Sequence, residues 1–223
     1  MLDIVIKVNY IKELALSLLK GYNQRIMYRK DKKEEFYTKK AREEGYPARS
    51  VYKLSELDKK FRLFNVNDRI LDLGCAPGSW MMYLSKVVGP LGKVIGIDIS
   101  DISIDIEDNM SFIQKDILSF KKEDINKWQK YFDAVISDAA PSTSGIKDID
   151  VARSLELVEE VWKIARQTLR PRGIFLCKIF EGQGIDDFVK SIKPHFKLVK
   201  RFRPKAVSKY SREIYVVAIN YKI

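Results

Sequence analysis

The sequence is poor in the residues that build metal sites and covalent cross-links. Its 223 residues include one histidine and two cysteines, Cys75 and Cys177. The cysteines do not have the spacing of metal ligands, so we expect no bound metal. We interpret both as reduced, small apolar residues in a reducing compartment. The lone His195 is predicted to lie in a loop, because nothing in the sequence places it near a site.

Long apolar runs are also missing. No stretch approaches the 18 residues that would indicate a membrane span, so we expect no membrane contact. The N-terminus is too mixed in charge for a clear signal peptide. Residues 9–20 fit an amphipathic helix. We expect a cytoplasmic protein; the alternative is a mitochondrial or other organellar location if residues 1–28 are a presequence, against which Asp3 and Glu13 count.

Basic residues outnumber acidic ones, but unevenly. The net charge is +11; residues 1–62 have 16 basic and 9 acidic side chains, residues 63–189 have 15 and 20, and residues 190–223 have 10 and 1. If the basic ends meet in space, they form a basic rim on a mildly acidic centre. Such a rim suits a polyanion, and nucleic acid is the commonest one. The alternative is a generally basic protein with no such partner.

Apolar runs alternate with helical patterns from about residue 68 onward. The runs lie at 69–73, 93–98, 111–115, 132–138, 173–180, 196–202 and 213–220, and the longest helical stretch at about 150–169. Continuous apolar strands between helices indicate a parallel sheet covered on both faces. The last two runs have no helix between them and should pair antiparallel. An apolar fraction of 46% suffices for a core.

Two helices are expected before this alternating part. Residues 29–44 read as a charged, exposed helix that Gly45-Tyr46-Pro47 ends. A second helix carries Val51, Leu54, Leu57 and Phe61 on one face. We therefore expect an N-terminal extension of unknown role at 1–28 and a single domain at 29–223.

The segment Asp72 to Trp80 is the most informative in the chain. It follows the apolar run at 69–71 and combines a strand end, a glycine turn and a helix start, which is the arrangement of a nucleotide pocket. The pattern is G-x-A-x-G rather than G-x-G-x-x-G, and Pro77 lacks the N–H that a pyrophosphate would need. This favours a nucleoside ligand without phosphates. Asp98, twenty residues past Gly78, is placed to accept hydrogen bonds from ribose hydroxyls. A glycine turn in an unrelated α/β protein is the alternative.

Charged residues interrupt two of the apolar runs near their C-terminal ends. Asp138 ends the run at 132–138, and Lys178 lies within the run at 173–180. Isolated, partly buried charges are costly unless paired, so we expect the two to meet at the mouth of the sheet. A solvated strand end for either alone is the alternative. Glu213 is the one acid among the ten basic residues of the last segment, whereas Lys53 looks like an ordinary helix position.

The chain resembles the FtsJ/RrmJ family of RNA ribose 2′-O-methyltransferases over about Tyr37 to Ala218. The resemblance rests on five segments: GYPARSVYKL at 45–54, LDLGCAPGSW at 71–80, SDAAP at 137–141 with Ser144-Gly145, KIFEG at 178–182 and KYSREIY at 209–215. Cys75 and Ser79 stand where the family usually has Ala or Gly, and residues 1–28 have no counterpart. The resemblance implies a Rossmann-like class I methyltransferase fold, an α/β architecture with a seven-stranded, mostly parallel sheet, an antiparallel last strand and helices on both faces.

The resemblance also implies an activity and a set of site residues. The family uses S-adenosylmethionine (SAM), and its catalytic Lys, Asp, Lys and Glu fall on Lys53, Asp138, Lys178 and Glu213. The expected cofactor-binding residues are Gly74, Ala76, Pro77, Gly78, Trp80, Asp98, Asp116, Ile117 and Asp138.

We expect a monomeric enzyme that methylates a ribose 2′-hydroxyl of RNA, with large-subunit ribosomal RNA or a ribosomal subunit as its partner. Lys178 is expected to contact the hydroxyl, either as a base or as an orienting cation. The basic segments 25–53 and 190–212 should hold the RNA, with Tyr46, Tyr52 and Tyr210 available to stack on bases. The alternatives are a tRNA anticodon loop or an mRNA cap as substrate, a SAM enzyme acting on a small molecule, and a non-catalytic RNA-binding ribosome-assembly factor.

Overall fold

The computed structural model describes residues 34–120, 123, 126, 128, 130–208 and 210–222. They form a seven-stranded sheet with the order β3-β2-β1-β4-β5-β7-β6. The strands are β1 (Arg69–Leu73), β2 (Lys93–Asp98), β3 (Met110–Gln114), β4 (Phe132–Ser137), β5 (Leu169–Phe180), β6 (Phe196–Phe202) and β7 (Glu213–Tyr221). The five strands β1 to β5 are parallel, and β7 runs antiparallel to β5 and β6.

Every predicted strand is present, and the antiparallel pairing of the last two is confirmed. The largest difference is at β5, which begins at Leu169 rather than at 173. The long helix α5 (Lys147–Thr168) therefore passes directly into this strand. Sequence periodicity could not show that boundary, because Arg170, Pro171 and Arg172 break the apolar run.

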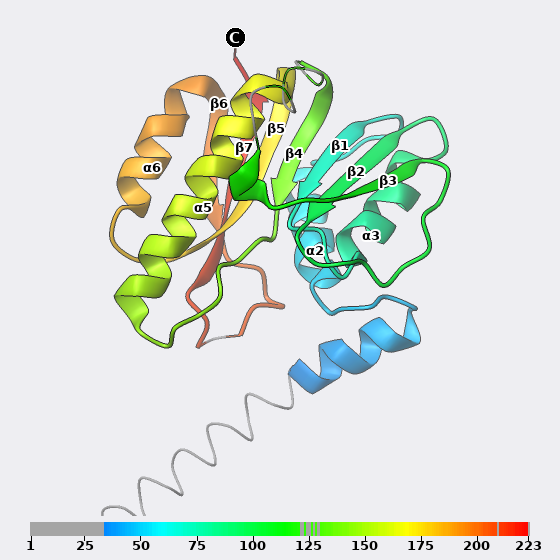
Figure 1. Cartoon of the computed structure of the whole chain (residues 1–223), viewed down its shortest axis with the longest axis horizontal. Helices are drawn as coiled ribbons and strands as arrows, with labels where there is room; N and C mark the ends of the chain where they lie inside the picture. The colour runs from blue at the N-terminus through cyan, green and yellow to red at the C-terminus, as the bar shows by residue number, and fades with distance from the viewer. Residues whose placement is uncertain are drawn as a thin grey trace, which may run out of the picture.

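Helices cover both faces of the sheet, as Figure 1 shows. Helices α5 and α6 (Ile185–Ile192) lie on one face, and α2 (Val51–Phe61) and α3 (Ser79–Val88) lie on the other. Each face has its own hydrophobic cluster, one that includes Trp162 and Phe175 and one that includes Leu54 and Trp80. A parallel strand buried on both faces is mostly apolar, which is why these strands read as nearly continuous apolar runs.

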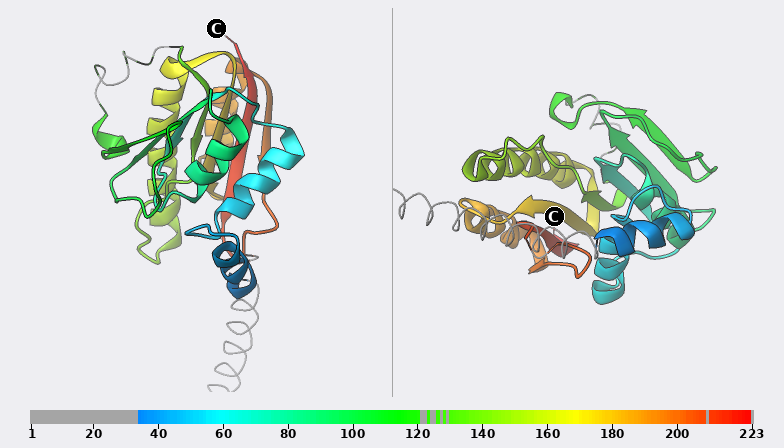
Figure 2. Two further views of the ribbon diagram at one scale, coloured as in Figure 1. Left: turned by 90° about the vertical axis from the view of Figure 1, so that its right-hand side faces the viewer. Right: turned by 90° about the horizontal axis from the view of Figure 1, so that it is seen from below.

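Residues 34–43 are helical and extend from the body beyond the loop that leads into α2 (Figures 1 and 2). An ion pair of 3.2 Å between Arg49 and Glu34 ties this helix to that loop. The predicted charged helix at 29–44 is thus present from residue 34 to 43. Its first residues, the amphipathic pattern at 9–20 and the extension at 1–28 lie outside the described residues.

Within the described ranges, no helix has both the length and the apolar character that a bilayer crossing requires. The two cysteines are free and buried, as expected. His195 lies in a short 3-10 helix, η2 (Lys193–His195), where its ring packs beside Trp162. The loop prediction for His195 was close, since η2 is a single turn between α6 and β6.

Candidate active site

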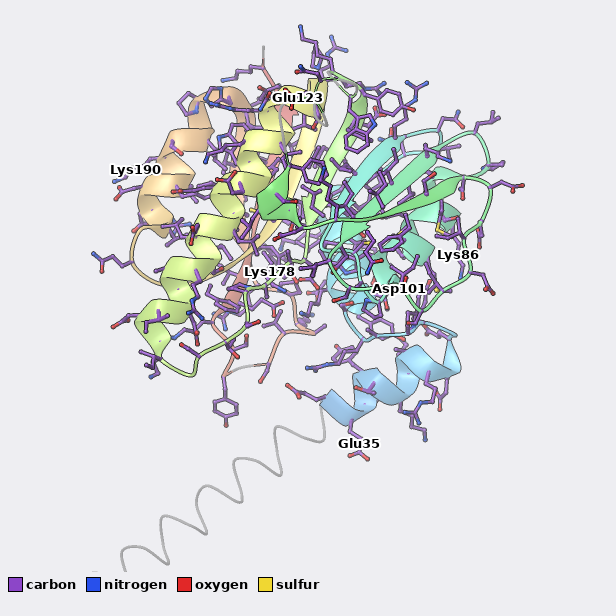
Figure 3. All side chains as sticks on the ribbon, viewed as in Figure 1. Glu35, Lys86, Asp101, Glu123, Lys178 and Lys190 are labelled. Atoms are coloured by element: carbon purple, nitrogen blue, oxygen red, sulfur yellow. The ribbon has the colours of Figure 1, made fainter. Side chains whose placement is uncertain are left out.

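Charged side chains from four elements converge at the carboxyl end of the central strands. Asp138 follows β4, Lys178 lies on β5, and Glu213 opens β7. The Lys178 Nζ is 3.1 Å from Asp138 Oδ1 and also donates to the Asp138 backbone carbonyl. The expectation that these two charges meet at the mouth of the sheet is confirmed. Figure 3 shows Lys178 near the centre of the molecule, between its two helical layers.

Lys53 joins the same cluster from α2. Its Nζ is 2.6 Å from Glu213 Oε1, and both side chains are largely buried. Leu54 and Leu57 anchor this helix in the core and so fix the direction in which Lys53 points. The structure therefore brings together all four residues that the sequence predicted for the catalytic centre.

Tyr215 connects the two ion pairs, and sequence reasoning missed it. Its hydroxyl is 2.7 Å from Asp138 Oδ1 and 2.8 Å from Glu213 Oε1, and its ring is fully buried. The spacing in the sequence could have identified it, because residues i and i+2 of a strand share a face and Tyr215 lies two residues after Glu213. The strand register also places Tyr215 opposite Lys178.

The two lysines determine the charge of Asp138. Burial by itself would raise the pKa of Asp138, but the ammonium groups of Lys178 and Lys53 and the Tyr215 hydroxyl outweigh it. The net effect holds the pKa of Asp138 below its usual value. Asp138 is therefore a carboxylate at neutral pH, and two cations and two carboxylates balance in a small, mostly buried volume.

A cavity of about 560 Å³ opens beside this cluster. Its size is that of a small-molecule site. Its lining includes six of the predicted cofactor residues: Gly74, Ala76, Asp98, Asp116, Ile117 and Asp138. It also includes residues that the sequence did not single out, among them Ile99, Leu118 and Leu157.

The glycine turn shapes one wall of the cavity. Gly74 has φ +80°, and a Cβ there would lie 2.5–2.8 Å from atoms of Ala139, so only glycine fits. The Ala76 N–H donates to Asp98 Oδ2 at 2.9 Å, and the Ser100 N–H donates to Asp98 Oδ1 at 2.8 Å. These bonds fix the carboxylate at the end of β2, where lone pairs stay available to a ligand.

The predicted cofactor residues Pro77, Gly78 and Trp80 do not line this cavity. Trp80 is 2% exposed, and its indole N–H donates to the Ser50 carbonyl at 2.9 Å. Its ring lies 6.1 Å from that of Tyr215. Trp80 thus packs beside the charged cluster through Tyr215. Gly78, at φ +107°, precedes the first residue of helix α3. The peptide bond between Ala76 and Pro77 is cis.

A second cavity, of about 250 Å³, lies on the other side of the cluster. Lys53 and Glu213 line it, and so do Arg49 and Tyr210. Tyr210 is 59% exposed, so its ring is free to stack on a base. Of the other predicted stacking residues, Tyr52 donates its hydroxyl to Glu44 at 2.9 Å, and the ring of Tyr46 lies under Lys86.

One buried carboxyl group in this region has no hydrogen-bond partner. Both oxygens of Asp72, on β1, are unpartnered, and the residue is 0% exposed. Burial and the nearby Asp138 and Asp98 raise the pKa of Asp72 well above its usual value. Both effects favour the protonated, uncharged form of Asp72 over the carboxylate. Across the described residues, no cluster of three or more His, Cys, Asp or Glu side chains has the arrangement of a metal site.

Comparison with known proteins identifies relatives over most of the chain. Residues 46–221 match the family model described as FtsJ-like methyltransferase. The ribosomal RNA large subunit methyltransferase E of Desulfatibacillum aliphaticivorans is 44% identical over 188 residues, which cover 84% of this chain and 91% of that protein. The protein of the same name from Desulforapulum autotrophicum is 40% identical over 194 residues, 87% of this chain and 96% of the relative.

A solved structure supports the same relationship. A crystal structure described as a ribosomal RNA methyltransferase from Plasmodium falciparum superimposes with a TM-score of 0.68 at 32% identity. The match covers 79% of this chain and 98% of that one. The similarity therefore extends through the sheet and both of its helical layers, which agrees with the predicted fold class.

Proposed function

The chain belongs to the FtsJ-like methyltransferase family, and from this premise we propose that it methylates a ribose 2′-hydroxyl of large-subunit ribosomal RNA with SAM as methyl donor. One observation carries the proposal. The Lys178–Asp138 pair belongs to a charged cluster that borders two cavities. Asp138 lines the larger cavity, which suits a nucleoside cofactor, whereas Lys53 and Glu213 line the smaller cavity beside Tyr210. A methyl donor on one side and an acceptor on the other would meet at this pair.

The larger cavity fits SAM in its chemistry. Asp98 offers a fixed carboxylate to ribose hydroxyls, and Asp116 and Ile117 offer a polar and an apolar contact to a base. Gly74 lets the backbone approach the ligand closely. When bound, SAM supplies a methyl group on a sulfonium, which is electrophilic without help from a metal.

Lys178 is proposed to hold the acceptor hydroxyl. Its ammonium has three N–H donors, and two of them are directed to Asp138, one to the backbone carbonyl and one to Oδ1. The third is available to the ribose oxygen. A cation at that position aligns the oxygen and stabilises negative charge as it develops. In ideal cases, alignment of reactants lowers a barrier by roughly 7–11 kcal/mol.

Lys53 and Glu213 complete the wall next to the smaller cavity. Their ion pair of 2.6 Å fixes both side chains, so they offer a rigid surface to the target nucleotide. Arg49 at the rim would contact a phosphate, and Tyr210 would stack on a base. The predicted RNA-binding segments are 25–53, of which the structure describes residues 34–53, and 190–212. Both contribute residues to this opening and would supply further phosphate contacts. We propose that residues 29–223 act together as one methyltransferase domain.

The test is methyl transfer from labelled SAM to defined RNA substrates. Large ribosomal subunits purified from cells that lack this activity, free ribosomal RNA, tRNA and capped mRNA are compared, and the methylated nucleotide is mapped by its 2′-O-methyl signature. We expect incorporation into large-subunit RNA at a ribose. Label confined to tRNA or to the cap, label on a base, or no label in any RNA would refute the proposal.

A further inference from the structure

The two lysine–carboxylate pairs of the active site are joined into one chain by the Tyr215 hydroxyl. The order of contacts is Lys178 Nζ to Asp138 Oδ1, Tyr215 Oη to the same Asp138 oxygen and to Glu213 Oε1, and Lys53 Nζ to that same Glu213 oxygen. Each contact is 2.6–3.1 Å long. The tyrosine is 0% exposed, so water does not compete for its hydroxyl.

The phenol cannot satisfy both carboxylates at once. It has one proton, so it donates to one carboxylate at a time, and the other must rely on its lysine. When the proton points to Asp138, Glu213 is held by Lys53 alone. When it points to Glu213, Asp138 Oδ1 keeps its contact with Lys178 but loses the donor of Tyr215, and Asp138 draws that ammonium more strongly. The position of one proton therefore links the two ends of the chain.

We propose that Tyr215 is a positioning residue that couples the Lys53–Glu213 pair to Lys178, so that the charge on Glu213 sets how tightly Asp138 holds the Lys178 ammonium. The inference rests on the proposed function, because its consequence appears in methyl transfer. Tyr215 acts through Asp138 and Lys178. Tyr215 is fully buried and lines neither of the two cavities, and its ring packs beside that of Trp80.

Of the other charged groups near the tyrosine, Lys53 acts on Asp138 through its charge, while its ion pair is with Glu213. Asp72 on β1 interacts with Asp138 and Asp98, yet it makes no hydrogen bond. Asp98 on β2 is bonded to backbone N–H groups of the glycine turn and the following loop. On the α3 side the nearest partner is the uncharged Trp80. The hydroxyl of Tyr215 is thus the hydrogen-bonded connection between Asp138 and Glu213.

The coupling predicts shifts of opposite sign in two variants. Tyr215→Phe removes a donor from both carboxylates, which become more basic and hold the lysine protons more tightly. The kcat–pH profile should then move to higher pH. Glu213→Gln removes a negative charge and leaves the Tyr215 proton to Asp138. The Asp138 carboxylate then becomes less basic, and the kcat–pH profile should move to lower pH.

The experiment measures kcat against pH, SAM affinity by calorimetry and Tm, each for the wild-type protein, both single variants and their combination. Tyr83→Phe is the matched control, because Tyr83 also donates its hydroxyl to a carboxylate, that of Asp58 at 2.7 Å, but lies outside the cluster. We expect Tyr215→Phe to lower kcat by about tenfold, the loss expected for a hydrogen bond to a charged group, with SAM affinity nearly unchanged. Tyr83→Phe should leave the pH profile in place.

The combined variant provides the decisive result. If the hydroxyl carries the coupling, Glu213→Gln should shift the kcat–pH profile of the protein that retains Tyr215. In the Tyr215→Phe variant, the same change should shift the profile by less than half as much. Equal shifts in both backgrounds, or an unmoved profile in Tyr215→Phe, would overturn the inference while wild-type methyl transfer stands. If Tyr215→Phe does not fold, an unmoved profile in Glu213→Gln alone overturns it. A wild-type protein without RNA methylation would instead reject the proposed function.

Discussion

Replacing Lys178 by methionine tests the centre of the proposed mechanism. The change keeps most of the side-chain volume and removes the cation that contacts Asp138 at 3.1 Å. A group that orients the acceptor and assists proton loss contributes at least the roughly 10²–10⁴-fold of general acid–base catalysis. We therefore expect kcat to fall by about 10³-fold or more, since orientation is lost as well. SAM affinity should change little, because Lys178 does not line the larger cavity.

The same change must also destabilise the protein. Lys178 is 8% exposed, so its removal leaves the Asp138 carboxylate buried without its closest cation. Breaking a buried ion pair in this way costs roughly 3–5 kcal/mol. Tyr215 and Lys53 still stabilise the carboxylate, which places the loss near the lower end of that range. At about 2–4 °C per kcal/mol for a chain of this size, Tm should fall by about 6–12 °C.

A second variant separates these two effects. Lys178→Met combined with Asp138→Asn removes both charges, so most of the lost stability should return while activity stays absent. Lys190→Met is the control for total charge, since Lys190 is an exposed residue of α6 far from Lys178 (Figure 3). Activity is read as methyl transfer to ribosomal RNA, and stability as Tm. A kcat within tenfold of wild type in folded Lys178→Met would refute the assigned role of this lysine.

Three further predictions concern the cofactor cavity and the core beneath it. Asp98→Ala should raise the Kd for SAM about 10–100-fold in calorimetry, because it removes an anionic hydrogen-bond acceptor, whereas the exposed Asp101→Ala should not. Gly74→Ala should lower Tm and SAM affinity together, since positive φ costs about 1–2 kcal/mol and the new Cβ meets Ala139. Burial raises the pKa of Asp72, so the stability that its protonated form contributes is complete below about pH 4 and is lost as the pH rises. The Tm of Asp72→Asn, measured relative to that of the wild type, should therefore increase between about pH 4 and pH 8. A Tm difference that stays constant over this range would contradict the prediction.

The sequence predicted the sheet well because its strands are buried on both faces. Such strands are continuous apolar runs, so a charge within them is conspicuous, and Asp138 and Lys178 could be found by chemistry alone. Lys53 could not be found that way. It lies on an amphipathic helix where a lysine is ordinary, and its role depends on how Leu54 and Leu57 dock that helix. The family resemblance supplied that residue, and the packing explains it.

Trp80 and Tyr215 show a different limit of sequence reasoning. Both are large aromatic residues near the motifs, and a motif does not tell whether such a side chain faces the ligand or the core. The structure places both rings in the core. The two residues differ in the hydrogen-bond partners of their polar groups. The indole N–H of Trp80 satisfies a backbone carbonyl and fixes the entry to α2. The Tyr215 hydroxyl instead lies within hydrogen-bond distance of two carboxylates, those of Asp138 and Glu213.

Charge balance explains how the fold tolerates this cluster. Two ammonium groups and two carboxylates would each be costly to bury alone, but each contacts an opposite charge, so the desolvation cost is offset only while all four are present. It follows that loss of activity in any single variant of the cluster has two causes, missing chemistry and an uncompensated charge. Neutral paired replacements remove the second cause. Comparing Lys53→Met with Lys53→Met combined with Glu213→Gln therefore measures what Lys53 does for the reaction apart from what it does for the fold.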